Sequence, residues 1–91
     1  MFITISYDIV DNRRRAKLAK LLLDYGYRVQ KSVFECDLDD RQFLKLKGLI
    51  EALIDWEEDS VRYYFLCGRC RGNVEVSGWG VVREEEEVII A

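Results

Sequence analysis

The sequence contains no histidine, and this absence excludes several kinds of site. Histidine-based acid–base catalysis, serine–histidine–aspartate and cysteine–histidine nucleophile systems, and histidine-containing zinc centres all require an imidazole. A glycine-rich phosphate loop is also missing, because residues 67–73, CGRCRGN, lack both the spacing and the lysine of such a loop. The candidates that remain for chemistry are carboxylates, hydroxyls, thiols and cations.

The chain also lacks proline and any apolar run close to the ~20 residues that a membrane-spanning helix needs. Its first ten residues, MFITISYDIV, have no basic region and include Asp8, so they predict a strand and not a secretory signal. An odd number of cysteines and no targeting segment favour a cytoplasmic location without a membrane partner. At 91 residues we expect one domain with a small core, which a partner chain would stabilise.

Hydrophobic periodicity predicts an α+β protein. Residues 2–9 alternate between apolar odd positions and more polar even positions, which is typical of a strand with one buried face. The following segment has helical spacing from its N-cap, Asp11, to a terminating glycine, Gly26. Residues 27–38 change side-chain parity within a strand-like run, which predicts a hairpin with a bend or bulge near Gln30–Ser32.

A second helix is expected from Asp39, with Gln42 completing a capping box. An acidic loop follows at Asp55–Ser60, and strands are expected over residues 61–67 and 73–77. The order is strand, helix, two strands, helix, strand and an extra C-terminal strand. This order predicts a ferredoxin-like βαββαβ antiparallel sheet with both helices on one face.

The predicted fold leaves the second face of the sheet bare, with Phe2 and Asp8 on it. A bare sheet face that carries an aromatic side chain needs a partner. We therefore expect a face-to-face homodimer of a domain spanning residues 1–78. Residues 79–91 form a C-terminal extension for which packing on the partner chain is one expected role.

Asp8 has the clearest chemical meaning. It ends the first strand on the bare face, where a carboxylate is costly to bury unless it is paired, hydrogen-bonded or bound to a metal. In a symmetric dimer the two Asp8 side chains can meet across the axis, and a divalent cation relieves their repulsion. Mg²⁺ prefers one or two carboxylates with waters, and it can activate water against a phosphodiester. The alternative interpretation is that Asp8 only caps the turn into the helix.

Basic residues concentrate in residues 13–31, whereas residues 35–60 are predominantly acidic. Arg13, Arg14 and Arg15 occupy the first turn of the predicted helix, where cations oppose the helix macrodipole. Arginine side chains and helix N-terminal amides both bind phosphate, so these residues predict a nucleic-acid-binding surface. Ordinary solvent-exposed charge is the alternative.

Cys67 and Cys70 form a single Cys-x-x-Cys pair, and only Cys36 remains as a further thiol. Structural zinc needs four ligands, and a redox pair would open a helix, so we interpret these cysteines as turn and core thiols. The four glutamates at 84–87 predict a solvated tail.

Four segments, in this order, resemble the small CRISPR-associated adaptation protein family, the second core subunit of that system. They are ISYDI in the first strand, RRRAKLAKLL in the first helix, GYRVQKSVFEC in the hairpin and VRYYFLCGRC in the fourth strand. The resemblance covers roughly residues 1–78, and the tail from Trp79 matches nothing in the family. It implies a ferredoxin-like homodimer whose C-terminal strand packs against the partner's sheet. Family members bridge dimers of the CRISPR integrase subunit and hold the DNA that is inserted as a new spacer.

The same resemblance implies an activity and its residues. Some family members are Mg²⁺-dependent endonucleases on RNA or duplex DNA, and the family's strand-end aspartate falls on Asp8, with Tyr7 beside it as a supporting residue. The family's basic positions and its hairpin aromatic fall on Arg14, Arg15, Arg28 and Phe34.

Several functions stay open on this basis. One is a metal-dependent endonuclease that holds Mg²⁺, or another divalent cation, at Asp8, and whose activity spacer integration does not need. Another is a purely non-catalytic adaptor that binds DNA and the integrase subunit. A toxin-type ribonuclease of the same fold and a small-molecule regulatory domain are further alternatives, although no polar-anchored ligand pocket is predicted. The preference between RNA and DNA is left open as well.

Overall fold

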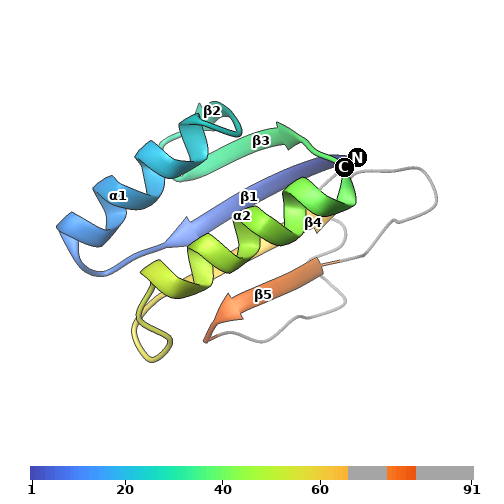
Figure 1. Ribbon diagram of the computed structural model, residues 1–91. Coiled ribbons are helices and arrows are strands. Elements are labelled where there is room, and N and C mark those ends of the chain that lie inside the picture. Colours follow the sequence, from blue (N-terminus) through green and yellow to red (C-terminus); the bar gives the residue numbers. More distant parts are fainter. Residues whose placement is uncertain (66–73, 80–91) are drawn as a thin grey trace.

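The computed structural model describes residues 1–65 and 74–79, which form a sheet layer and a helix layer (Figure 1). In chain order the elements are β1 (Phe2–Asp8), α1 (Asn12–Leu23), β2 (Gly26–Gln30), β3 (Val33–Asp37), α2 (Asp40–Leu53), β4 (Ser60–Phe65) and β5 (Val74–Gly78).

All the strand pairs are antiparallel, and the strand order across the sheet is β2-β3-β1-β4-β5. The first four strands have the ferredoxin-like layout, and β5 extends the sheet beside β4, as predicted. β5 pairs with β4 of its own chain. The packing of a C-terminal strand against a partner's sheet, which the resemblance implies, remains a prediction. Residues 80–91 lie outside the described part of the chain, so the domain boundary at residue 78 and the packing of the tail on a partner remain predictions.

Both helices begin where the sequence predicts, because a side chain satisfies their first amides. The Asp11 carboxylate accepts hydrogen bonds from the amides of Arg13 (2.6 Å) and Arg14 (3.3 Å) at the start of α1. Asp39 and Gln42 form the complete capping box of α2, with reciprocal side-chain-to-amide bonds of 2.7 and 3.0 Å. These caps set where each helix leaves the sheet.

Gly26 does not terminate α1, contrary to the sequence-based expectation. The helix ends at Leu23, with Asp24 as its C-cap, and Gly26 is the first residue of β2. A Cβ at Gly26 would collide with the carbonyl oxygen of Glu35 and lie 2.6 Å from the sulfur of Cys36. Glycine is therefore required there by the close approach of β3 and not by a helix end.

The predicted irregularity of the hairpin is present inside β2. The register between β2 and β3 shifts between Arg28 and Gln30, slightly before the expected position, and Lys31 and Ser32 form the turn. The side chains of Phe34 and Cys36 point to the same side of the sheet as the odd-numbered residues of β1, because these residues lie opposite Ile5 and Ile3.

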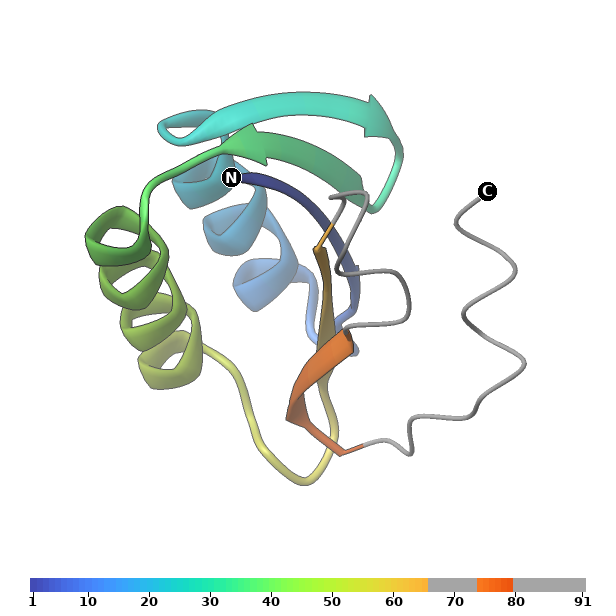
Figure 2. The same cartoon turned by 90° about the vertical axis from the view of Figure 1, so that its right-hand side faces the viewer.

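Both helices pack on one face of the sheet, and Figure 2 shows this arrangement edge-on. The odd-numbered residues of β1 are buried beneath the helices, whereas the even-numbered residues face the other way, as predicted. Leu49 of α2 is exposed. No helix among residues 1–65 and 74–79 has the length and hydropathy of a membrane span. The largest fully buried apolar side chains of the core are Tyr63, Phe34, Ile3, Ile5, Leu18, Leu22, Leu46 and Ile50.

Candidate nucleic-acid site

Asp8 ends β1 on the face of the sheet that the helices do not cover. It lies opposite Ser60 in the β1–β4 pairing, and its side chain is exposed. Within the described part of the chain, no hydrogen bond or ion pair reaches its carboxylate. The position agrees with the expectation for this residue, and the carboxylate is available to a ligand.

A hollow of about 300 Å³ surrounds Asp8 on this face. Side chains that alternate between the two faces of β1 and β4 form this hollow, because Ser6 lies opposite Arg62 and Thr4 lies opposite Tyr64. The hollow therefore combines a carboxylate, hydroxyls, a guanidinium and aromatic rings on one surface. Its lining includes Ser6, Asp8, Ser60, Arg62, Tyr64 and Trp79.

Arg62, Tyr64 and Trp79 were not identified as site residues from the sequence. A signal for the first two was present, since they alternate within the VRYYF segment of β4 on the side that pairs with the even positions of β1. No comparable pattern precedes Trp79, which reaches the hollow only because β5 returns antiparallel to β4.

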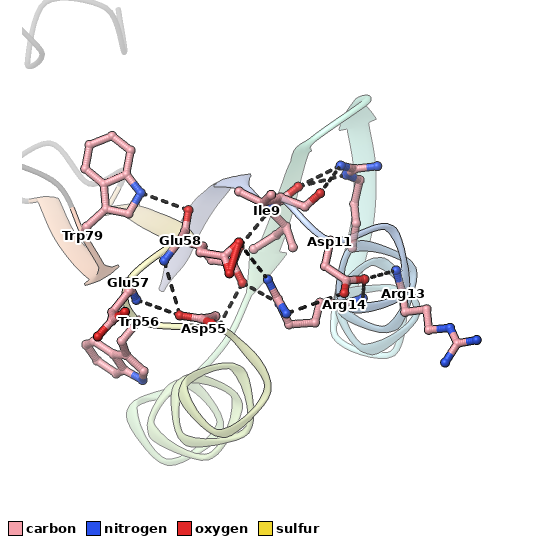
Figure 3. Close-up of polar contacts among 12 residues, drawn as sticks. Ile9, Asp11, Arg13, Arg14, Asp55, Trp56, Glu57, Glu58 and Trp79 are labelled. Atoms are coloured by element: carbon pink, nitrogen blue, oxygen red, sulfur yellow. Dashed lines mark hydrogen bonds and ion pairs between the residues drawn. The ribbon is translucent and has the colours of Figure 1, made fainter.

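Beside the hollow, the fully buried carboxylate of Asp59 joins three segments. One oxygen accepts the amide of Val10 at 3.0 Å, and the other accepts the amide of Asp55 at 2.9 Å and Nε of Arg14 at 2.8 Å. Figure 3 shows Arg14 extending from α1 toward this loop. The contacts connect the end of β1, the first turn of α1 and the loop before β4.

The hydrogen bonds also decide the charge of Asp59. Burial by itself raises the pKa of this carboxyl, but the Asp55 and Val10 amides and the Arg14 guanidinium more than offset that effect. The pKa of Asp59 therefore lies below its ordinary value of 3.8, and the carboxylate stays ionised at neutral pH. The hydrogen bond to Asp59 likewise raises the pKa of Arg14.

The three consecutive arginines have three different environments. Arg14 is committed to Asp59, and it also lies 3.6 Å from Asp11 and 3.9 Å from Glu58. Arg15 donates from Nη2 to the carbonyl oxygen of Ile9 at 2.8 Å, and further bonds reach Val10 and Asn12. Arg13 is exposed, and its side chain points away from the loop (Figure 3). Of the three, Arg13 is the one whose guanidinium makes no hydrogen bond or ion pair among the described residues, and phosphate binding by any of them remains a prediction.

The side chains of Arg28, Phe34 and Tyr7 lie on the other side of the sheet from the Asp8 carboxylate. The Arg28 guanidinium lies 5.2 Å from the centroid of the Phe34 ring, which is fully buried and stacks on the buried Tyr7 at 6.2 Å. Phe34 can therefore support the site only through the packing of β1 and β3, whereas Tyr7 also contributes to the lining of the hollow. Arg28 itself is exposed at the edge strand and free of any carboxylate partner among the described residues.

Cys36 is buried in the core, and burial raises the pKa of its thiol to about 11. An un-ionised core thiol agrees with the interpretation from the sequence. Cys67 and Cys70, like the glutamates at 84–87, lie outside the described residues.

At the hollow, the described residues of one chain offer Mg²⁺ a single carboxylate, that of Asp8. No cluster of three or more carboxylates or thiols occurs in residues 1–65 and 74–79, so one protomer offers Asp8 and the neighbouring hydroxyls of Ser6 and Ser60. Mg²⁺ is commonly held by one or two carboxylates and several waters. A pair of Asp8 side chains from two protomers fits this requirement.

The described residues form a small ferredoxin-like protein with an open carboxylate on its bare sheet face and an exposed cation on α1. The family model for "CRISPR associated protein Cas2" matches residues 1–74, and the chain belongs to this family.

Individual relatives agree with this assignment. A Chloroflexus aurantiacus protein named CRISPR-associated endoribonuclease Cas2 1 is 47% identical over 90 residues, which is 98% of this chain and 97% of that protein. A Thermus thermophilus protein named CRISPR-associated endonuclease Cas2 2 is 46% identical over 84 residues, covering 92% and 89% of the two chains. The crystal structure of Streptococcus pyogenes Cas2 at pH 6.5 superimposes with a TM-score of 0.71 at 36% identity, covering 77% of this chain and 90% of that one.

Proposed function

We propose that this Cas2 family member is an endonuclease that hydrolyses phosphodiester bonds of nucleic acid at Asp8, with Mg²⁺ or another divalent cation. The observation that carries the proposal is the exposed Asp8 carboxylate, which lines a hollow together with Arg62 and two serine hydroxyls. The names of the relatives, endoribonuclease and endonuclease, support nuclease activity.

The active form is a homodimer joined through the bare sheet face. Phe2 on that face is 43% exposed, and a core this small leaves apolar surface that a second copy can cover. A two-fold axis places identical surfaces against each other, so the ends of both β1 strands approach the axis. The two Asp8 carboxylates then form one anionic site.

Four side chains of the hollow have a part in the proposed reaction. Asp8 would hold the cation, which when bound would lower the pKa of water and stabilise negative charge on the phosphate. Arg62 provides a cation for the non-bridging oxygens of the phosphate. The hydroxyls of Ser6 and Ser60 orient water or phosphate oxygens by hydrogen bonds.

A second role is that of an adaptor in CRISPR adaptation, which holds DNA between copies of the integrase subunit. The observation in its favour is the exposed basic side of α1, which carries Arg13, Lys17 and Lys20 away from the Asp8 hollow. Such a surface contacts phosphates without reading the sequence. Spacer integration would use this surface and not the Asp8 site.

Replacing Asp8 with asparagine tests both roles together, because the change keeps the size and removes one charge per protomer. Asp8→Asn should abolish Mg²⁺-dependent cleavage of RNA and DNA while the dimer and spacer integration with the integrase subunit persist. Asp37→Asn is the matched control, since Asp37 lies on the same face of the sheet and pairs with the N-terminal amine. Cleavage by Asp8→Asn at the wild-type rate would remove the enzymatic role, and failed integration by an intact dimer would place Asp8 in DNA handling.

A further inference from the structure

Trp79 forms an aromatic wall of the Asp8 hollow because the chain turns sharply at the preceding residue. Gly78 has a φ of 94°, a conformation that L side chains rarely adopt, and a Cβ there would collide with the carbonyl oxygen of Asp59. The turn directs Trp79 back over the loop that precedes β4. It thereby joins Asp8, Ser60, Arg62 and Tyr64 in lining one hollow.

Two hydrogen bonds hold Trp79 in place. Its amide donates to the carbonyl oxygen of Asp59 at 3.1 Å, and its indole Nε1 donates to the carbonyl oxygen of Glu58 at 3.1 Å (Figure 3). The loop beneath it is held in turn by the buried Asp59 carboxylate. The indole is therefore oriented before any ligand arrives, although 56% of Trp79 remains exposed.

Trp56 provides an internal comparison. It is exposed to a similar degree, and its indole Nε1 also donates to a backbone carbonyl, that of Glu51. Figure 3 shows it at the other side of the 55–58 loop, and it does not line the hollow. The two tryptophans thus share exposure and hydrogen bonding, but only Trp79 lies beside the carboxylate.

We propose that Trp79 is a stacking platform for an unpaired nucleobase next to the phosphate that is cleaved at Asp8. This inference rests on the proposed nuclease function and adds a residue that positions its substrate. An aromatic ring with an open face binds any base by stacking, and such platforms commonly lie beside a cationic surface for the backbone. Bases in a duplex are already stacked on their neighbours, so the platform selects against fully paired strands.

The fixed orientation of the indole determines how much stacking contributes to the affinity for a single strand. A ring that is already hydrogen-bonded loses little conformational freedom when a base stacks on it. Removal of one such platform weakens single-strand binding by about 5- to 150-fold, which corresponds to the stacking contribution of one base. The interaction is uncharged, so the dependence of binding on salt concentration should not change.

The test measures the binding of full-length protein to a fluorescent single-stranded RNA of about 12 nucleotides in EDTA, where cleavage does not interfere. Trp79→Ala should weaken this binding by about 5- to 150-fold at an unchanged salt slope, whereas Trp79→Phe should retain most of it. Trp56→Phe and Trp56→Ala serve as controls and should bind as the wild type does. In a series of RNAs with one abasic site moved along the strand, one position should reduce wild-type affinity but not that of Trp79→Ala.

Equal affinity of Trp79→Ala and wild-type protein for the single strand would overturn the inference. A Trp79→Ala protein that sediments as a monomer, and that regains RNA affinity only at concentrations where it dimerises, would also overturn it, because Trp79 would then be a subunit contact. Either result leaves the proposed nuclease intact if cleavage still depends on Asp8. Wild-type protein that binds the RNA through Trp79 but does not cleave it with Mg²⁺ supports the platform and removes the proposed activity.

Discussion

Asparagine in place of Asp59 should destabilise the protein strongly, because this carboxylate accepts three hydrogen bonds inside the fold. The asparagine side chain can keep its single carbonyl oxygen toward Arg14 and the Asp55 amide, but its NH₂ group then faces the Val10 amide. One charge-assisted bond to a buried amide disappears, and the Arg14 guanidinium no longer has an ionised partner at this position. We expect a decrease of about 2–4 kcal/mol in the free energy of unfolding.

Thermal unfolding followed by circular dichroism at a fixed protein concentration measures this decrease. For a domain of this size the expected fall in Tm is about 10–25 °C. Glu58→Gln is the matched control, since Glu58 lies in the same loop and 3.9 Å from Arg14 but is half exposed. An exposed ion pair contributes about 0–1 kcal/mol, so the control should change Tm by a few degrees at most.

Acidification gives an independent check on the same residue. Because the pKa of Asp59 is lower in the folded chain than its ordinary value of 3.8, its stabilising contribution is complete above that value. The contribution is lost as the pH falls toward the folded pKa, so the Tm difference between wild type and Asp59→Asn should narrow below about pH 4. The pKa of Asp11 is lowered as well, but its effect is common to both proteins and cancels. A decrease of less than about 1 kcal/mol at neutral pH, or a difference that widens on acidification, would refute this account of Asp59.

Three further predictions concern packing, phosphate binding and assembly. Gly26→Ala should lower the free energy of unfolding in urea by about 1–3 kcal/mol, because the added Cβ meets the Glu35 carbonyl. Gly48→Ala, in a helix with no atom within 4 Å of the added Cβ, should raise it by about 0.5–1 kcal/mol. Equal effects of the two substitutions would contradict the close approach of β3. Arg13→Ala should reduce the slope of log affinity for nucleic acid against log salt concentration by about 1 for each phosphate that the arginine binds. Arg41→Ala, at an exposed position of α2, should leave the slope unchanged. The reverse result would place the phosphate-binding surface on α2. Phe2→Asp should convert the dimer to a monomer in sedimentation at micromolar concentration. Leu44→Asp, on the exposed side of α2, should remain a dimer. A monomeric wild-type protein would contradict the shared Asp8 site.

The parts of the fold that depend on local pattern were predictable. Alternation in residues 2–9 correctly separates the buried face of β1 from the face that carries Asp8. The caps at Asp11 and Asp39 follow from side chains that satisfy nearby amides, and a capping interaction spans only about three residues. The end of α1 was not predicted correctly, because the need for glycine at position 26 comes from β3, which follows later in the chain.

The parts of the site that depend on distant contacts were not predictable. Asp59 belongs to an acidic run that resembles a solvated loop, and nothing local distinguishes it from Asp55 or Glu58. The unfavourable position of Arg14 in the first turn of α1 indicated an anionic partner, and the structure provides the Asp59 carboxylate, 45 residues away in the sequence. Phosphate binding by Arg14 remains a prediction. Trp79 was not predicted as a site residue either, because its neighbours depend on the antiparallel pairing of β5 with β4 and on the turn at Gly78.

In the proposed dimer two Asp8 carboxylates share one catalytic cation, and mixed dimers test this sharing most directly. Wild-type and Asp8→Asn chains are refolded together in equal amounts, and Mg²⁺-dependent cleavage of a single-stranded RNA is compared with that of wild type at the same total concentration. If both carboxylates are needed, only wild-type homodimers cleave, and the activity should fall to about one quarter. An activity of about one half would mean that each Asp8 acts alone, and cleavage that Asp8→Asn does not reduce at all would contradict the Asp8 site itself.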